Sequence, residues 1–126
     1  MRILFIYILI ISFSYADLHK PSDGENLRYI HILFEWDQEP NAISYNLQAS
    51  TGQSFNNIIL NIEEETTVYI DTENLDWNET YYWRVRPIYN SSDFGDWTEI
   101  SNFSIGEIFF IQPLDHINQD VALFVY

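Results

Sequence analysis

The amino-acid sequence predicts an all-β protein, a sandwich of six or seven strands. Apolar residues recur with a period of two along several short runs, and turn-forming residues separate the runs at spacings of roughly 8 to 12 residues. No stretch shows the 3.6-residue period of an amphipathic helix. The length of 126 residues suits one compact domain, and an aromatic content of 17% gives that domain ample side-chain area for a core.

Two strands are predicted in the first part of the chain. The apolar face of residues 29–36 consists of Ile30, Ile32, Phe34 and Trp36. The apolar face of the second run consists of Tyr45, Leu47 and Ala49. Breaks that contain Pro40 and Gly52 follow the two runs, as expected for turns between half-buried strands.

The next two strands are shorter. Phe55 and residues 58–62 form the third run, and residues 66–70 form the fourth, in which Val68 and Ile70 are the expected core residues. Three consecutive glutamates, residues 63–65, predict a charged bend between these runs.

The longest strand is predicted at residues 80–88, after a corner at residues 74–78. A polar loop at residues 90–96 then precedes a last strand at residues 97–105.

Leu75 and Tyr81 bracket the predicted corner. This arrangement indicates a tyrosine corner, in which a buried ring packs in the core while its hydroxyl bonds a backbone group a few residues upstream. Trp36 is the expected centre of the core. The residues predicted for the central core are Phe34, Trp36, Tyr45, Leu47, Leu75, Tyr81, Trp83 and Val85.

A set of short motifs lies along the predicted strands and corners: Pro21-Ser-Asp-Gly24, Phe34-Glu-Trp36, residues 42–48, Leu75, Glu79-Thr-Tyr-Tyr-Trp-Arg-Val-Arg86, Gly95-Asp-Trp-Thr98 and Phe103-Ser-Ile105. Together these motifs resemble the fibronectin type III domains of secreted bacterial proteins. The resemblance covers about residues 18–106, and its most specific part is the run from Tyr81 to Arg86. It implies an immunoglobulin-like β-sandwich of about seven strands.

The two ends of the chain lie outside this resemblance. Arg2 and an apolar run over residues 3–13, followed by small residues up to Ala16, predict a cleaved signal peptide at residues 1–16. The domain would then occupy residues 17–106. Residues 107–126 form an apolar extension, which we interpret as the start of a second domain. The alternative is that this extension adds a strand to the sandwich or pairs with the exposed sheet edge of a partner.

Composition argues against several classes of function. With 19 acidic and 5 basic residues, a formal charge of −14 opposes nucleic-acid binding, and the lack of cysteine excludes disulfides and thiolate metal sites. The three histidines are too far apart for a zinc motif, and His19 is expected in a frayed N-terminal segment. The acidic residues near positions 63–76 lack calcium-loop spacing, so a solvated edge is preferred over a calcium site.

An exposed cluster on the longest strand is the candidate interaction face. Arg84 and Arg86 are expected to point outward, with the Trp97 indole stacked over one or both guanidinium groups. The candidate face consists of Tyr82, Arg84, Arg86, Tyr89, Phe94 and Trp97. This candidate face has three interpretations: a stabilising surface stack, a protein-binding face, and an aromatic platform for a carbohydrate.

These observations predict a secreted or cell-surface module without catalytic residues, metal or cofactor. The resemblance implies a spacer or protein-interaction unit at the N-terminal end of a larger extracellular protein. The alternative is an accessory or carbohydrate-binding module of a secreted enzyme whose catalytic domain lies beyond residue 126. No stable membrane insertion is expected once the signal is removed.

Overall fold

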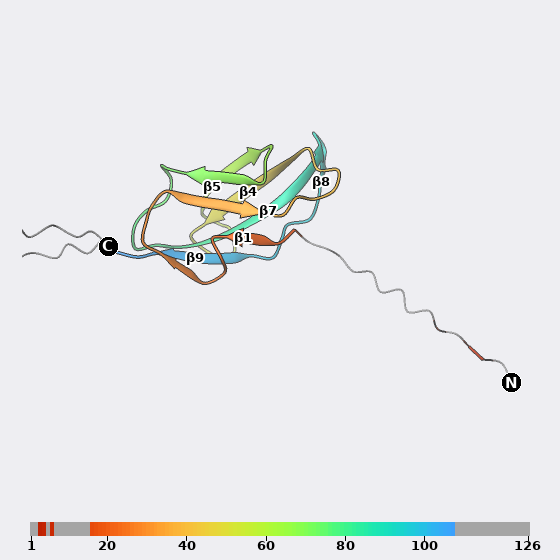
Figure 1. Ribbon diagram of the computed structural model, residues 1–126, viewed down its shortest axis with the longest axis horizontal. Coiled ribbons are helices and arrows are strands. Elements are labelled where there is room, and N and C mark those ends of the chain that lie inside the picture. Colours follow the sequence, from red (N-terminus) through yellow and green to blue (C-terminus); the bar gives the residue numbers. More distant parts are fainter. Residues whose placement is uncertain (1–2, 5, 7–15, 108–126) are drawn as a thin grey trace, which may run out of the picture.

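The computed structural model describes residues 3–4, 6 and 16–107, and residues 16–107 form a sandwich of two β-sheets (Figure 1). The predicted all-β sandwich is confirmed, and no helix occurs among the described residues. The strands are β1 (Leu18–Lys20), β2 (Glu25–Leu27), β3 (Ile32–Trp36), β4 (Ser44–Ser50), β5 (Ile58–Glu64), β6 (Val68–Asp71), β7 (Thr80–Asn90), β8 (Asp93–Phe94) and β9 (Ser101–Ile105).

The two sheets differ in their number of strands. The three-stranded sheet has the order β1-β3-β6, and the six-stranded sheet has the order β2-β9-β7-β4-β5, with β8 paired to β7. All pairs are antiparallel except β2 and β9, which run parallel. The chain passes from one sheet to the other through the short turn between β1 and β2. These two N-terminal strands have three residues each, too few to show an alternating pattern in the sequence.

Large aromatic rings from both sheets form the centre of the core. The Phe34 ring of β3 meets the Trp83 ring of β7 edge to face, with centroids 5.1 Å apart and an interplanar angle of 72°. It meets Phe103 of β9 in the same way, at 5.8 Å and 73°. The eight residues predicted for the central core are each at most 3% exposed. Edge-to-face packing of this kind stabilises a core beyond the area that it buries.

The prediction for β6 is wrong, because Val68 and Ile70 point away from the core and are 42% and 56% exposed. Directly paired residues share a face of a sheet. In the observed register Phe34 lies opposite Tyr69, and Leu33 lies opposite Ile70. Tyr69 therefore packs on the core, and the aliphatic side chains of β6 lie on the outer face.

Other expectations at strand ends need correction. Two of the three glutamates expected in a bend belong to β5, and the bend covers residues 65–67. The last strand begins at Ser101 rather than at Trp97, and the expected polar loop contains β8. The first predicted strand begins only at Ile32.

His19 also differs from the expectation of a frayed segment, since it lies in β1, which pairs with β3. Its Nε2 atom lies 2.5 Å from Oδ1 of Asp37. This hydrogen bond raises the pKa of His19 above its usual value and lowers the pKa of Asp37. The pair attaches the first strand to the loop after β3.

The tyrosine corner has the expected geometry. The Tyr81 hydroxyl accepts a hydrogen bond of 2.8 Å from the backbone N–H of Asp76, and Leu75 beside it is 2% exposed. Burial raises the pKa of the Tyr81 hydroxyl, so the group stays neutral at physiological pH.

We expect Tyr81→Phe to lower the free energy of unfolding by about 1 kcal/mol, because the ring stays in place while one partly buried hydrogen bond is lost. Urea denaturation followed by circular dichroism measures this difference. Tyr82→Phe on the same strand is the control and should change stability by less than about 0.5 kcal/mol, because Tyr82 is only half-buried. Equal losses in the two variants would contradict the structural role of the corner.

Candidate functional site

The outer face of the six-stranded sheet carries two arginines in a fixed register. Alternate residues of β7 point outward, and these include Arg84 and Arg86. In the pairing of β7 with β4, Arg84 lies opposite Gln48 and Arg86 lies opposite Asn46. Each guanidinium group therefore extends beside an amide side chain of the neighbouring strand.

Aromatic rings and guanidinium groups alternate on this face. The Cζ atom of Arg84 lies 4.0 Å from the centroid of the Phe55 ring and 4.1 Å from that of Trp97. The Cζ atom of Arg86 lies 4.4 Å from the Trp97 ring and 4.4 Å from the Phe94 ring. We call the resulting stack the aromatic–arginine ladder; it consists of Phe55, Arg84, Trp97, Arg86 and Phe94.

Amide hydrogen bonds hold the arginines in this stack. Nε and Nη2 of Arg84 donate to Oε1 of Gln48 at 3.1 and 2.8 Å. Nε of Arg86 donates to Oδ1 of Asn46 at 3.2 Å, and Nδ2 of Asn46 donates in turn to Asn61 on β5 at 2.8 Å. The ladder thus connects three adjacent strands.

Among the described residues, no direct ion pair neutralises the charge of the ladder. No carboxylate of residues 16–107 lies within 4.0 Å of either guanidinium group. Burial lowers the pKa of Arg84, and the positive charge of Arg86 lowers it further, yet an arginine remains protonated in proteins. Glu63 lies in the same cross-strand row as Arg86, but its carboxylate accepts a hydrogen bond from Ser44 instead.

An irregular segment after β8, rather than a strand, brings Trp97 over the arginines. Gly95 N–H donates to the carbonyl of Pro87 at 2.8 Å, and a Cβ atom on Gly95 would lie 2.5 Å from the Pro87 ring. Thr98 then bonds Val85 twice, through its backbone N–H at 2.8 Å and its hydroxyl oxygen at 3.1 Å. Only glycine fits this close approach, so Gly95 positions the indole.

The structure places the candidate residues in two groups. Arg84, Arg86, Phe94 and Trp97 come together in the ladder, whereas the contacts of the described residues do not include Tyr82 or Tyr89 in it. Both tyrosines are half-buried. Burial raises the pKa of the Tyr89 hydroxyl, with smaller contributions from nearby carboxylates.

Sequence reasoning missed Phe55 as a member of the ladder. It was expected in a strand, but it lies in the turn before β5, with a positive φ of 56° and an exposed fraction of 8%. Gln48 and Asn46 were missed as well. Their polar, outward positions were visible in the alternation of β4, but their contact with the arginines depends on the register between β4 and β7.

Other kinds of site have little support in the described residues. No group of three or more histidine, aspartate or glutamate side chains within residues 16–107 is arranged to hold a metal ion. The described part of the chain contains no helix with the length and hydropathy that a bilayer crossing requires. The predicted signal peptide and the extension after residue 107 fall mainly outside the described residues.

Comparison with known proteins identifies the fold. No known family model matches the sequence, and no curated protein matches it. A solved structure, described as that of an Fn3-like protein from Clostridium thermocellum, matches with a TM-score of 0.52 and 19% sequence identity. The match covers 75% of this chain and 93% of that one. The chain therefore has a fibronectin type III-like fold.

Proposed function

We propose that this protein is a non-catalytic module that acts outside the cell as a spacer or protein-interaction unit. The sandwich fold and the signal-like N-terminus support this proposal. The aromatic–arginine ladder is the proposed contact surface, and a protein surface rich in carboxylates is the proposed partner.

The unpaired charge of the ladder is the observation that carries this proposal. The chain has 19 acidic residues, yet within residues 16–107 none forms an ion pair with Arg84 or Arg86. The hydrogen bonds of Arg86 within the described residues use only Nε, so its two terminal nitrogens remain as donors. A guanidinium group held by stacking binds a carboxylate with little further loss of side-chain entropy.

The carbohydrate alternative has less support at this face. A sugar-binding platform needs a flat aromatic surface open on one side. The Trp97 ring is already in contact with two guanidinium groups, at 4.1 and 4.4 Å, so a sugar ring would compete with an arginine for the indole.

Binding of a fluorescein-labelled oligoglutamate peptide tests the interaction role. We expect the purified protein to bind this peptide in preference to an oligoserine peptide, and Arg86→Gln to weaken binding about tenfold, as expected for loss of a charged hydrogen-bonded contact. Arg28→Gln is the matched control, because it removes the same charge from an exposed residue outside the ladder. Fluorescence anisotropy gives the affinities at low and at physiological salt.

Equal weakening by the two variants would show that only net charge matters and would contradict a specific contact. No binding at all would also contradict it and would favour the spacer role, in which the ladder only stiffens the sheet.

Export is the second part of the proposal. We expect the exported protein to begin at Asp17, because small residues precede that position. Mass spectrometry of exported material gives the N-terminus directly, and a chain that retains Arg2 would contradict cleavage.

A further inference from the structure

The outer face of the three-stranded sheet is apolar at one end. Leu33 of β3 lies opposite Ile70 of β6, which is 56% exposed, and Val68 on the same strand is 42% exposed. Tyr29, in the segment before β3, is 54% exposed. Antiparallel sheets often have one face open to solvent, but the outward positions are then mostly polar.

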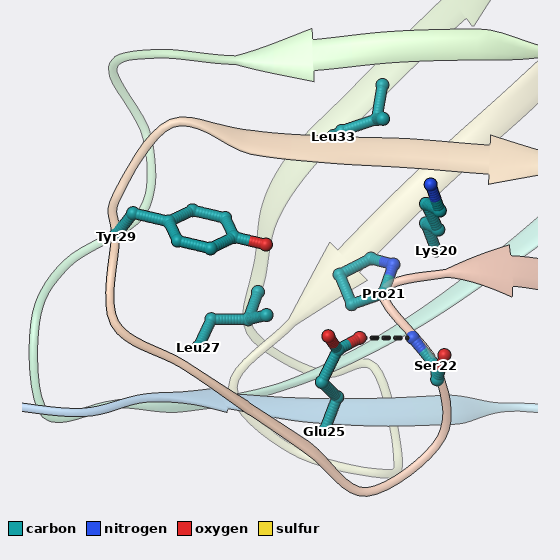
Figure 2. Close-up of a pocket in the computed structure, with 7 residues that line it drawn as sticks. All are labelled: Lys20, Pro21, Ser22, Glu25, Leu27, Tyr29 and Leu33. Atoms are coloured by element: carbon teal, nitrogen blue, oxygen red, sulfur yellow. Dashed lines mark hydrogen bonds between the residues drawn. The ribbon is translucent and has the colours of Figure 1, made fainter.

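A cleft lies beside this apolar surface, where β1 and β2 pass between the two sheets (Figure 2). It encloses about 270 Å³ and is lined by Lys20, Pro21, Ser22, Glu25, Leu27, Tyr29 and Leu33. The carboxylate of Glu25 already has a hydrogen-bond partner in the wall of the cleft, because it accepts a hydrogen bond of 2.8 Å from the backbone N–H of Ser22. Four of the seven lining residues are apolar or aromatic, and Lys20 and Ser22 add polar groups. In Figure 2 the Tyr29 ring lies at the left of the cleft, and Lys20 and Pro21 lie at its right.

The chain leaves the sandwich next to this cleft. Leu27 and Ile105 are partners in the parallel pairing of β2 with β9, and the N–H of Gly106 donates to the carbonyl of Leu27 at 2.7 Å. Because Leu27 lines the cleft, Gly106 lies at its border. After Glu107 the sequence continues with Ile108, Phe109, Phe110 and Ile111, which lie outside the described part of the chain.

We propose that residues 108–111 of the same chain dock in this cleft and extend over Leu33 and Ile70. Four extended residues span roughly 13 Å, whereas a cavity of this volume is about 8 Å across, so the segment is long enough to cross it. Docking removes the apolar side chains of the segment and of the cleft from water. This burial is the main favourable contribution to such a contact.

The same chain is a better occupant than a second copy. A segment that starts at the border of its site has an effective concentration in the millimolar range. Two copies would each bring a formal charge of −14 to a shared interface, which opposes association. The proposal is independent of the ladder, which lies on the other sheet, and it is compatible with a domain that follows residue 113.

Thiol reactivity in the full chain tests this proposal, because the natural sequence has no cysteine. We expect the thiol introduced by Ile70→Cys to react with iodoacetamide about tenfold more slowly than the thiol introduced by Ile43→Cys. Ile43 is the matched control. It is 61% exposed against 56% for Ile70, and it lies by the far end of β7, where Ser44 pairs with Ile88.

A second substitution identifies the segment that protects the thiol. Adding Phe110→Ser to Ile70→Cys should raise its reactivity to that of the control, while adding it to Ile43→Cys should have no effect. Thermal melts establish that each variant is folded. Equal reactivity of the two thiols, or protection that survives Phe110→Ser, would overturn the proposal. Protection that grows with protein concentration would also overturn it and would indicate a second copy as the occupant.

Discussion

Trp83→Ala is expected to lower the free energy of unfolding by about 3–5 kcal/mol, the usual cost of deleting a large aromatic side chain from a core. Trp83 is 0% exposed and is in edge-to-face contact with Phe34. Its Nε1 atom has no hydrogen-bond partner among the described residues, so the substitution breaks no hydrogen bond. The loss comes from the transfer free energy of the ring and from the cavity that it leaves.

Urea denaturation followed by far-UV circular dichroism measures this loss without relying on tryptophan fluorescence. The expected change is a large share of the total stability of a small domain, which is typically about 5–15 kcal/mol. Trp83→Phe should cost clearly less, because a smaller ring still fills part of the site. Ile43→Ala, at a residue that is 61% exposed, is the control and should have little effect. A loss below about 1.5 kcal/mol for Trp83→Ala would show that the two sheets do not pack around this ring.

Trp97→Ala is expected to lower the free energy of unfolding by about 1–3 kcal/mol, because it removes two cation–π contacts worth about 0.5–2 kcal/mol each, with partial compensation by solvent. Both positive charges depend on the same ring, since Arg84 and Arg86 each stack on the Trp97 indole. Without the ring, the two guanidinium groups lose this shared contact.

Phe94→Ala is the matched control for Trp97→Ala. Phe94 forms one cation–π contact, with Arg86 alone, and it lies at the end of the ladder with 46% of its surface exposed. We expect about half the effect or less, and Trp97→Phe should restore part of the stability lost in Trp97→Ala. Equal losses for the terminal and the central ring would mean that the rings contribute separately and that the ladder does not act as a unit.

The aromatic–arginine ladder was partly predictable. Strict alternation along β7 placed Arg84 and Arg86 on the face opposite Trp83. Trp97, which follows the polar loop at residues 90–96, was then the expected stacking partner. Trp97 does stack on both arginines, but an irregular segment that depends on Gly95, rather than the predicted strand, holds the indole. The place of Phe55 in the ladder could not be predicted, because no local pattern shows that the turn before β5 folds toward Arg84 on β7.

The sequence alone determined the all-β class, the tyrosine corner and the residues of the central core. All three follow from local patterns, in which the side-chain period of two separates the faces of a strand. The face of β6 was decided only by the tertiary structure. Alternation shows that Val68 and Ile70 share one face and that Tyr69 and Asp71 share the other, but hydrophobicity favours the wrong pair for the core.

The pairing with β3 sets that choice, because Ile32 lies opposite Asp71 and Phe34 lies opposite Tyr69. Asp71 is 0% exposed and accepts hydrogen bonds from the backbone N–H and the side-chain amide of Asn74, at 3.0 and 2.7 Å, which offset the cost of its burial. Strand register depends on contacts between distant parts of the chain. A period of two leaves it open, and in this fold it decides which side chains form the core and which remain on the surface.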